Sequence, residues 1–195
     1  MAQRTFAMAA IDYFNETDEA RLVAEARHDP RAFGRLYALY VQPLFRYLYS
    51  RIGGVPEAED VTAQTFLAAL EAIGRYRHDG HFAAWLFAIA RYKTADYFRA
   101  QSAQRLRQAA LEDAEHLAVE SDLLQGAIQS ERSAALARLI AGLPEADRDL
   151  IRLRYVAELN FSEIGRLLGR SEEAAKKALY RLLARLQSQL ENPHA

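Results

Sequence analysis

Residues 143–187 carry the start and stop signals of two consecutive helices: LPEADRDLIRLRYVAELNFSEIGRLLGRSEEAAKKALYRLLARLQ. Asn160 can cap a short helix, and Glu163, three residues later, completes a capping-box pair. Gly169 ends that helix, because glycine tolerates the left-handed conformation found at helix C-termini. Ser171 can then cap a second, longer helix. This order of signals predicts a helix-turn-helix.

The second helix of this motif, predicted over 172–190, has one apolar and one basic face. Arg185 falls outside its apolar stripe, and so do four further cationic or aromatic residues: Lys176, Lys177, Tyr180 and Arg181. A basic outer face on this helix is typical of binding in the DNA major groove, so these four and Ser171 are candidate DNA contacts. The alternative is an ordinary helical hairpin with a solvated basic face.

The rest of the chain is also helical in its periodicity, and no convincing strand pattern is present. Helices are predicted over 18–28, 31–52, 56–73, 81–108, 132–141, 144–158, 161–168 and 172–190. Large apolar residues become sparse over 109–131. We therefore expect an all-α protein with two small helical domains joined by a linker. The expected parts are an N-terminal extension (1–17), a helical bundle (18–108), an acidic linker (109–131) and a helix-turn-helix domain (132–195).

The composition indicates a folded protein of the cytoplasm. Of the 195 residues, 51% are hydrophobic and 26% are charged, and there is no cysteine. Without cysteine there is no disulfide framework or thiolate metal site, which fits a reducing compartment. The apolar runs are too short for a membrane span, and the N-terminus makes a poor signal peptide. We expect no membrane insertion.

Charge is distributed unevenly, although the formal net charge is only −1. Residues 75–110 contain seven Arg or Lys against two acids, and 162–190 contain six against three. Residues 111–131 contain six acids and no Lys or Arg. Two basic blocks therefore flank an acidic one, a pattern that favours two nucleic-acid-binding faces on a protein with weak overall charge.

Residues 75–100, RYRHDGHFAAWLFAIARYKTADYFRA, interleave aromatic and cationic residues. Phe82, Trp85, Leu86 and Ile89 have the spacing of a core stripe and are assigned to the core. The loop and the outer helix face supply seven further candidates: Arg75, Tyr76, Arg77, Arg91, Tyr92, Lys93 and Arg99. Bases taken out of a duplex stack on aromatic rings while cations hold the backbone, so these seven are candidate contacts to a melted strand.

The helix predicted over 56–73 has an apolar stripe and an opposite polar face. The stripe comprises Ala58, Val61, Thr62, Thr65, Phe66, Ala69, Leu70 and Ile73. The opposite face, here called the acidic ridge, comprises Glu57, Asp60, Gln64 and Glu71. Such a ridge is either an ordinary solvated face or a docking surface for a basic partner, and spacing alone does not separate the two.

Enzyme motifs are missing from the sequence, which has no HExxH, Walker loop, GxSxG or glycine-rich phosphate loop. The pairs His28-Asp29 and His78-Asp79 suggest a helical metal phosphohydrolase as an alternative. Each pair adjoins a helix breaker, and no convincing further ligand set accompanies them. We therefore expect no enzyme activity, no metal and no cofactor.

Three motifs in order resemble the extracytoplasmic-function (ECF) sigma factors of bacterial RNA polymerase, in the sigma-70 family. AEDVTAQTFLAAL (58–70) resembles the helix that docks on the β′ clamp helices of the polymerase core. FAAWLFAIARYKTADYFR (82–99) resembles the F-x-x-W-L-x-x-I-A-R-x-x-x-x-D-x-x-R pattern that opens and reads the promoter near the start site. Residues 143–171 resemble the domain that reads the upstream promoter element.

The resemblance implies a sigma factor that binds core polymerase and directs promoter recognition and melting, with core polymerase, promoter DNA and an anti-sigma factor as partners. Tyr92 stands where the family usually has Asn, and Ala63-Gln64 replace a common Gln-acid pair. The recognition helix over 171–178 departs from the usual S-x-G-T-V-K-S-R, so only phosphate or groove contacts are expected there. The alternative is a helix-turn-helix regulator that does not engage polymerase.

Overall fold

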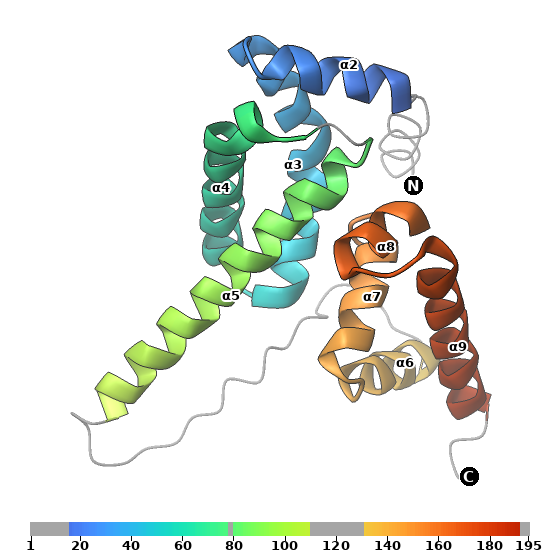
Figure 1. Cartoon of the computed structure of the whole chain (residues 1–195). Coiled ribbons are helices and arrows are strands. Elements are labelled where there is room, and N and C mark those ends of the chain that lie inside the picture. Colours follow the sequence, from blue (N-terminus) through green and yellow to red (C-terminus); the bar gives the residue numbers. More distant parts are fainter. Residues whose placement is uncertain (1–15, 78–79, 110–130, 192–195) are drawn as a thin grey trace.

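The computed structural model describes residues 16–77, 80–109 and 131–191, and this part of the chain is helical without strands (Figure 1). The predicted all-α class is confirmed. The elements are α2 (Glu16–Ala26), α3 (Pro30–Ile52), α4 (Val55–Ala72), the 3-10 turn η1 (Ile73–Arg75), α5 (Phe82–Ala109), α6 (Glu131–Ala141), α7 (Glu145–Tyr155), α8 (Phe161–Leu168) and α9 (Glu172–Glu191). We call α2–α5 the N-terminal lobe and α6–α9 the C-terminal lobe.

The breaks between the first helices follow from local chemistry. Asp29 caps α3 by accepting a hydrogen bond from the Arg31 backbone N–H at 2.8 Å. Gly53 ends α3 at a φ of 93°, a backbone conformation that favours glycine. Pro56 lies in the first turn of α4, where its missing N–H leaves no helical hydrogen bond unmade.

The core of the N-terminal lobe lies between α3, α4 and α5. Phe82 and Leu86 are buried as predicted, and Trp85 and Ile89 are half-buried against the same cluster. Leu70 is a correction, because it was expected in the core and is 46% exposed. The reason is that α4 packs against α3 and α5 on one side only, and Leu70 lies beyond the edge of that buried stripe.

The C-terminal lobe contains the predicted helix-turn-helix, formed by α8 and α9. The Asn160 side chain accepts the Glu163 N–H at 2.8 Å, and the Glu163 carboxylate accepts the Asn160 N–H at 2.7 Å. Gly169 has a φ of 65°, in the left-handed region. The Ser171 hydroxyl oxygen accepts the Ala174 N–H at 3.2 Å and so caps α9. The capping box, the turn and the second cap are all confirmed.

One further glycine shapes this turn. A Cβ at Gly165 would lie 2.8 Å from the carbonyl oxygen of Arg170, inside van der Waals contact. The Arg170 N–H donates to the Gly165 carbonyl oxygen at 2.8 Å, which closes the chain tightly over the end of α8. Gly165 therefore sets how closely the turn can approach α8.

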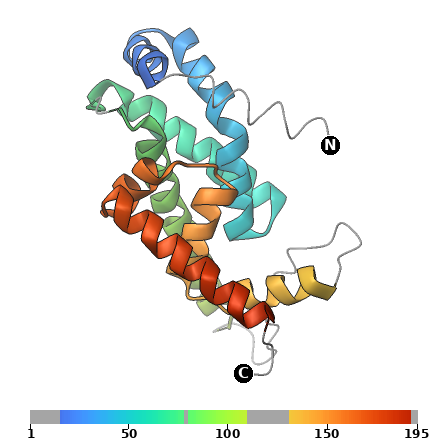
Figure 2. The ribbon, with the colours of Figure 1, turned by 90° about the vertical axis from the view of Figure 1, so that its right-hand side faces the viewer.

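The two lobes pack against each other. α8 lies against α5, and α7 lies against α3; Figure 2 shows the C-terminal lobe in front of α5. Leu153 and Ile164 belong to one continuous core cluster with the residues of the N-terminal lobe. The far half of α5 instead extends away from the body in Figure 1, and Leu106 on it is 72% exposed.

Two expected segments fall mostly outside the described residues: the extension 1–17 and the linker 109–131. In the part of the chain that is described, no helix is both long enough and apolar enough to cross a bilayer.

Candidate nucleic-acid interface

The basic face of α9 is fully open to solvent. Ser171, Lys176, Lys177, Tyr180 and Arg181 are all exposed, whereas Ala175, Leu179, Leu182 and Leu186 are buried beneath them. The Lys177 ammonium pairs with Glu173 at 3.2 Å, one turn earlier. Arg181 Nε donates to the Lys177 carbonyl oxygen at 3.3 Å. The helix therefore presents cations where the sequence predicts DNA contacts.

An aromatic cluster that the sequence analysis missed supports this helix. The Tyr180 ring lies 6.1 Å from the Phe161 ring of α8, and the Arg154 guanidinium of α7 lies over Phe161 at 5.2 Å. These contacts join the three helices around the turn, so the orientation of α9 is set by α7 and α8 together.

The candidate strand contacts in the loop before α5 lie in different environments. Arg75 and Arg77 are exposed. Tyr76 is only 6% exposed, and its ring packs against Trp85 at 4.7 Å and against Phe82 at 5.9 Å. Its carbonyl oxygen accepts a hydrogen bond from Arg27 at 2.8 Å. The expectation of an open stacking face at Tyr76 is therefore not met, because the ring fills the space above Trp85.

The candidate strand contacts on α5 also differ in their exposure. Tyr92 is 62% exposed, and Arg99 is exposed and paired with Asp96. Lys93 is half-buried. Arg91 is half-buried, and its Nε lies 3.3 Å from a carboxylate oxygen of Asp149 on α7. The C-terminal lobe thus holds one of the cations expected to contact a melted strand.

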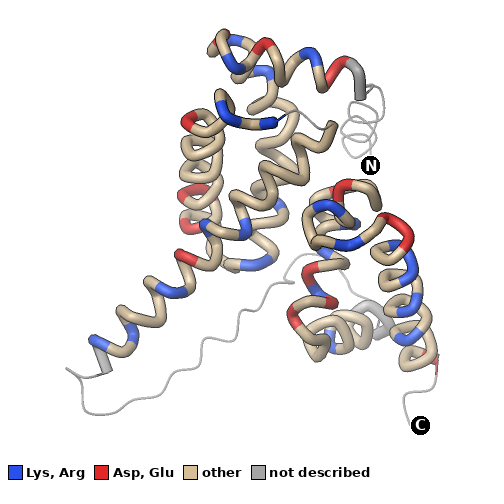
Figure 3. The backbone as a smooth tube through the Cα atoms, viewed as in Figure 1, with Lys and Arg blue, Asp and Glu red and all other residues tan. Residues whose placement is uncertain are grey.

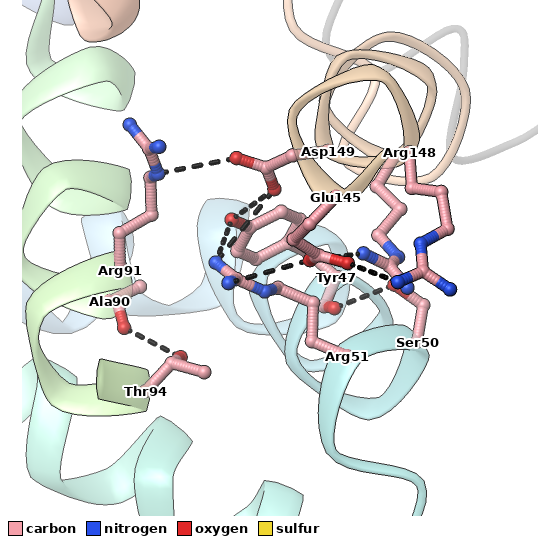
Figure 4. A network of polar contacts seen from close by, with 10 residues as sticks. Tyr47, Ser50, Arg51, Ala90, Arg91, Thr94, Glu145, Arg148 and Asp149 are labelled. Carbon is pink, nitrogen blue, oxygen red and sulfur yellow. Dashed lines mark hydrogen bonds and ion pairs between the residues drawn. The ribbon is translucent and has the colours of Figure 1, made fainter. Parts of the chain in front are cut away.

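Asp149 is the centre of a polar network between the lobes (Figure 4). It is 4% exposed and accepts a hydrogen bond from the Tyr47 hydroxyl at 2.8 Å. Arg51 donates to the Tyr47 hydroxyl oxygen at 3.0 Å and also lies 3.6 Å from Glu145. Burial and the nearby charge of Asp149 raise the pKa of Tyr47 well above its ordinary range. The phenol therefore stays protonated, and able to donate to Asp149, at alkaline pH values at which an exposed tyrosine ionises.

The acidic ridge lies on a different side of the molecule. Glu57, Asp60, Gln64 and Glu71 are all exposed, and the Gln64 amide donates to Asp60 at 2.8 Å. Figure 3 shows the acidic residues of α4 and the basic residues of α9 on opposite sides. Leu67 is 58% exposed and, with Leu70, adds apolar surface beside the ridge. The sequence analysis missed this apolar patch.

An open apolar groove of about 630 Å³ runs between α6, α7 and α9. Its lining includes Leu136, Ile140, Ile151, Leu183 and Leu190. The sequence analysis did not predict it, although the apolar stripe of 132–141 was a usable signal. An isolated amphipathic helix at the edge of a small domain leaves part of its apolar face without cover.

One of the two His-Asp pairs lies in the described part of the chain. Asp29 is the cap of α3, and His28 is exposed beside it. His78 and Asp79 lie outside the described residues. Within the described ranges, no group of three or more His, Asp or Glu is placed to hold a metal ion.

Comparison with known proteins accounts for both lobes. The pattern of "Sigma-70 region 2" matches residues 36–104, and that of "Sigma-70, region 4" matches residues 133–186. The ECF RNA polymerase sigma factor BldN of Streptomyces coelicolor is 36% identical over 176 residues, which cover 88% of this chain and 66% of BldN. The ECF sigma factor ShbA of Streptomyces griseus is 33% identical over 183 residues, which cover 85% of this chain and 87% of ShbA.

A solved structure has a similar arrangement. CnrH, in complex with the cytosolic domain of CnrY, is 26% identical and superposes with a TM-score of 0.61, over 88% of this chain and 96% of that chain. The family matches of both halves of the sequence, and the fold, therefore point to the same family that the three motifs resemble. This chain belongs to the extracytoplasmic-function sigma factors of the sigma-70 family, which are non-enzymatic subunits that bind core RNA polymerase and direct it to promoters.

Proposed function

We propose that this sigma factor divides its work among three faces. The acidic ridge of α4 docks on core polymerase, the outer face of α5 with the preceding loop holds the melted promoter strand, and α9 binds the upstream duplex. One observation carries this division: the ridge and the basic face of α9 are both exposed and lie on opposite sides. Polymerase and DNA can therefore be bound at the same time.

Polymerase docking is assigned to Glu57, Asp60, Gln64 and Glu71, with Leu67 and Leu70 beside them. Exposed leucines flanked by carboxylates resemble the make-up of a protein interface, which has an apolar centre and a polar rim. The expected occupant is a basic, helical surface of the β′ clamp. Charge complementarity would speed the encounter and fix its register.

Strand contacts are assigned to the exposed cations Arg75, Arg77 and Arg99 and to the open ring of Tyr92, with Lys93 and Arg91 beside them. Tyr76 has a supporting role, because its ring packs on Trp85 and its carbonyl oxygen is held by Arg27. It fixes the path of the loop that carries Arg75 and Arg77.

Upstream contacts are assigned to Ser171, Lys176, Lys177, Tyr180 and Arg181. We place the domain boundaries at 18–108 and 132–195, with 109–131 as an acidic linker that lets the two domains reach separate promoter elements. The end of α5 at Ala109 and the start of α6 at Glu131 support these boundaries.

A protein partner is also proposed. CnrH binds the cytosolic domain of CnrY, and we infer that this chain is likewise controlled by an anti-sigma factor. We place the chain in the cytoplasm, where the polymerase works.

The direct test is co-elution of the purified chain with core polymerase in gel filtration. A sigma factor is expected to elute with the core and to bind duplex DNA weakly when alone. A chain that binds duplex DNA tightly and stays separate from the core would instead support the helix-turn-helix regulator.

A further inference from the structure

The outermost line of α9 carries an acid among the proposed DNA contacts. An α-helix turns about 100° per residue, so a residue two positions from the buried Ala175 points about 160° away from it. Glu173 and Lys177 are the two residues at that spacing, one on each side of Ala175, and both are exposed. The Lys177 ammonium lies 3.2 Å from a carboxylate oxygen of Glu173. One carboxylate and one ammonium therefore face farthest from the protein.

The other exposed cations of α9 lie to the sides of this line. On the helical wheel, Lys176 is about 100° from Ala175 in one direction and Arg181 is about 120° from it in the other. When a helix enters a groove, its sides meet the phosphates of the two strands and its outermost line meets the base edges. Lys176 and Arg181 are therefore placed for phosphates, and Glu173 with Lys177 for bases.

The position of Glu173 along α9 also suits base contact. Glu173 is the second residue of this helix, and the N-terminal residues of a recognition helix are the ones that contact base edges. The Ser171 cap and the tight turn at Gly165 hold this end of α9 in a defined place. Figure 3 shows the acidic residues at the start of α9, ahead of its basic residues.

A carboxylate and an ammonium at the base edges select by complementarity. A carboxylate only accepts hydrogen bonds, and in the major groove cytosine presents only a donor, its N4 amino group. Guanine and thymine present acceptors to it, and adenine presents an acceptor beside its donor. An ammonium only donates, and guanine O6 and N7 both accept. Glu173 and Lys177 together therefore match the major-groove edge of G·C.

The ion pair between these residues does not prevent their use. Both side chains are largely exposed, and an exposed pair one turn apart contributes little to stability, so each side chain can turn toward DNA at small cost. An acid at this place opposes the attraction of the neighbouring cations to phosphates. The loss is offset only on DNA where a base donates to Glu173, so the acid penalises all other sequences.

We propose that Glu173 reads a cytosine and Lys177 a guanine of the upstream element, in one G·C pair or in two adjacent pairs. The inference rests on the assignment of α9 to the upstream duplex. It adds a residue that selects sequence to the cations that supply affinity. The usual pattern S-x-G-T-V-K-S-R has Gly and Ser at these two positions, so neither contact follows from the resemblance.

Glu173→Gln tests the contact, because it keeps the shape of the side chain and removes its charge. Glu172→Gln is the matched control: it makes the same change at an exposed site in the same first turn, but Glu172 is only about 60° from Ala175 on the wheel. If Glu173 served only the helix dipole, the two variants would behave alike. Lys177→Gln is a second variant, and circular dichroism monitors the fold of each.

The binding experiment uses holoenzyme assembled from the full chain and core polymerase, with core alone as the baseline. Holoenzyme selects duplexes from a library with a randomised segment, and the bound DNA is sequenced. Competition binding then compares a selected duplex with duplexes changed at one base pair of the upstream element, and with a duplex that lacks the element.

Wild-type holoenzyme is expected to lose about fivefold or more in affinity when one cytosine of the upstream element is replaced. E173Q should lose this discrimination at that position alone, and E172Q should keep it. K177Q should relax the preference for guanine in the same or the adjacent pair. E173Q should also bind the duplex without the element more tightly than wild type does, whereas structural damage to α9 would weaken binding to both duplexes.

Unchanged discrimination in E173Q, or an equal loss in E172Q, would overturn the inference. Arg181→Ala separates this failure from a failure of the proposed function. If R181A weakens upstream binding and E173Q matches the wild type, α9 binds the duplex and Glu173 reads no base. If neither variant changes binding, the assignment of α9 to the upstream duplex is wrong and the inference falls with it.

Discussion

Arg91 Nε on α5 lies 3.3 Å from a carboxylate oxygen of Asp149 on α7. A cation that local sequence places on a DNA-binding face is thus neutralised by a carboxylate from the other lobe. In a protein with a formal net charge of −1, such internal pairing limits nonspecific attraction to DNA, because nonspecific binding depends on cations that neutralise phosphates.

Reversing the charge of the acidic ridge should prevent docking. Asp60→Lys is expected to abolish co-elution with core polymerase. It should leave the thermal unfolding midpoint unchanged, because Asp60 is exposed and its side chain accepts an exposed hydrogen bond from Gln64, one turn later on the same helix. Glu59→Lys makes the same charge change about 100° away around the helix, outside the ridge, and should still co-elute. Normal assembly by D60K would refute docking through the ridge.

Removing a cation from α9 should weaken duplex binding to a similar extent for all DNA sequences. Arg181→Ala is expected to reduce the affinity for a mixed-sequence duplex and to lower the slope of log K against log salt by about one. Gln189→Ala, at an exposed neutral site on α9, should leave both unchanged. A loss confined to a single base position would mean that Arg181 reads a base and does not hold a phosphate.

The close approach at Gly165 should make the turn sensitive to a single methyl group. Gly165→Ala is expected to destabilise the chain by about 1–3 kcal/mol, because the new Cβ would crowd the Arg170 carbonyl. Gly34→Ala, in a helix with nothing within 4 Å of the added Cβ, should instead stabilise it by about 0.5–1 kcal/mol. Urea unfolding measures both, and equal effects of the two substitutions would contradict the account of the turn.

The raised pKa of Tyr47 predicts a loss of stability at alkaline pH. The unfolded phenol ionises near pH 10 and the folded one does not, so the stabilisation is complete below about pH 10 and is lost as pH rises toward the folded pKa. The free energy of unfolding of the wild type should therefore fall more steeply than that of Tyr47→Phe above pH 10, by up to about 1.4 kcal/mol per pH unit. Parallel curves would show that Tyr47 titrates normally.

Local signals predicted the helices and their ends closely. The caps at Asn160 and Ser171 and the left-handed Gly169 depend on neighbours within a few residues, so the sequence contains all of their chemistry. The division of α9 into buried and basic faces follows in the same way from a period of 3.6 residues.

Contacts between distant segments could not be predicted in this way. Tyr47 and Asp149 are 102 positions apart, and nothing in the pattern around either residue indicates the other. The sequence makes Tyr76 a candidate strand contact because it lies between Arg75 and Arg77 in a predicted loop, and only the position of Trp85 explains why its ring is covered. Leu70 was placed in the core because periodicity does not show how wide a stripe the neighbouring helices cover.

Run-off transcription with purified core polymerase on a random promoter library decides whether the chain directs the polymerase to promoters. We expect transcripts that depend on the chain and start on templates sharing two separated elements, with D60K giving none. Transcripts that do not require the chain, or that start without any shared element, would contradict this expectation.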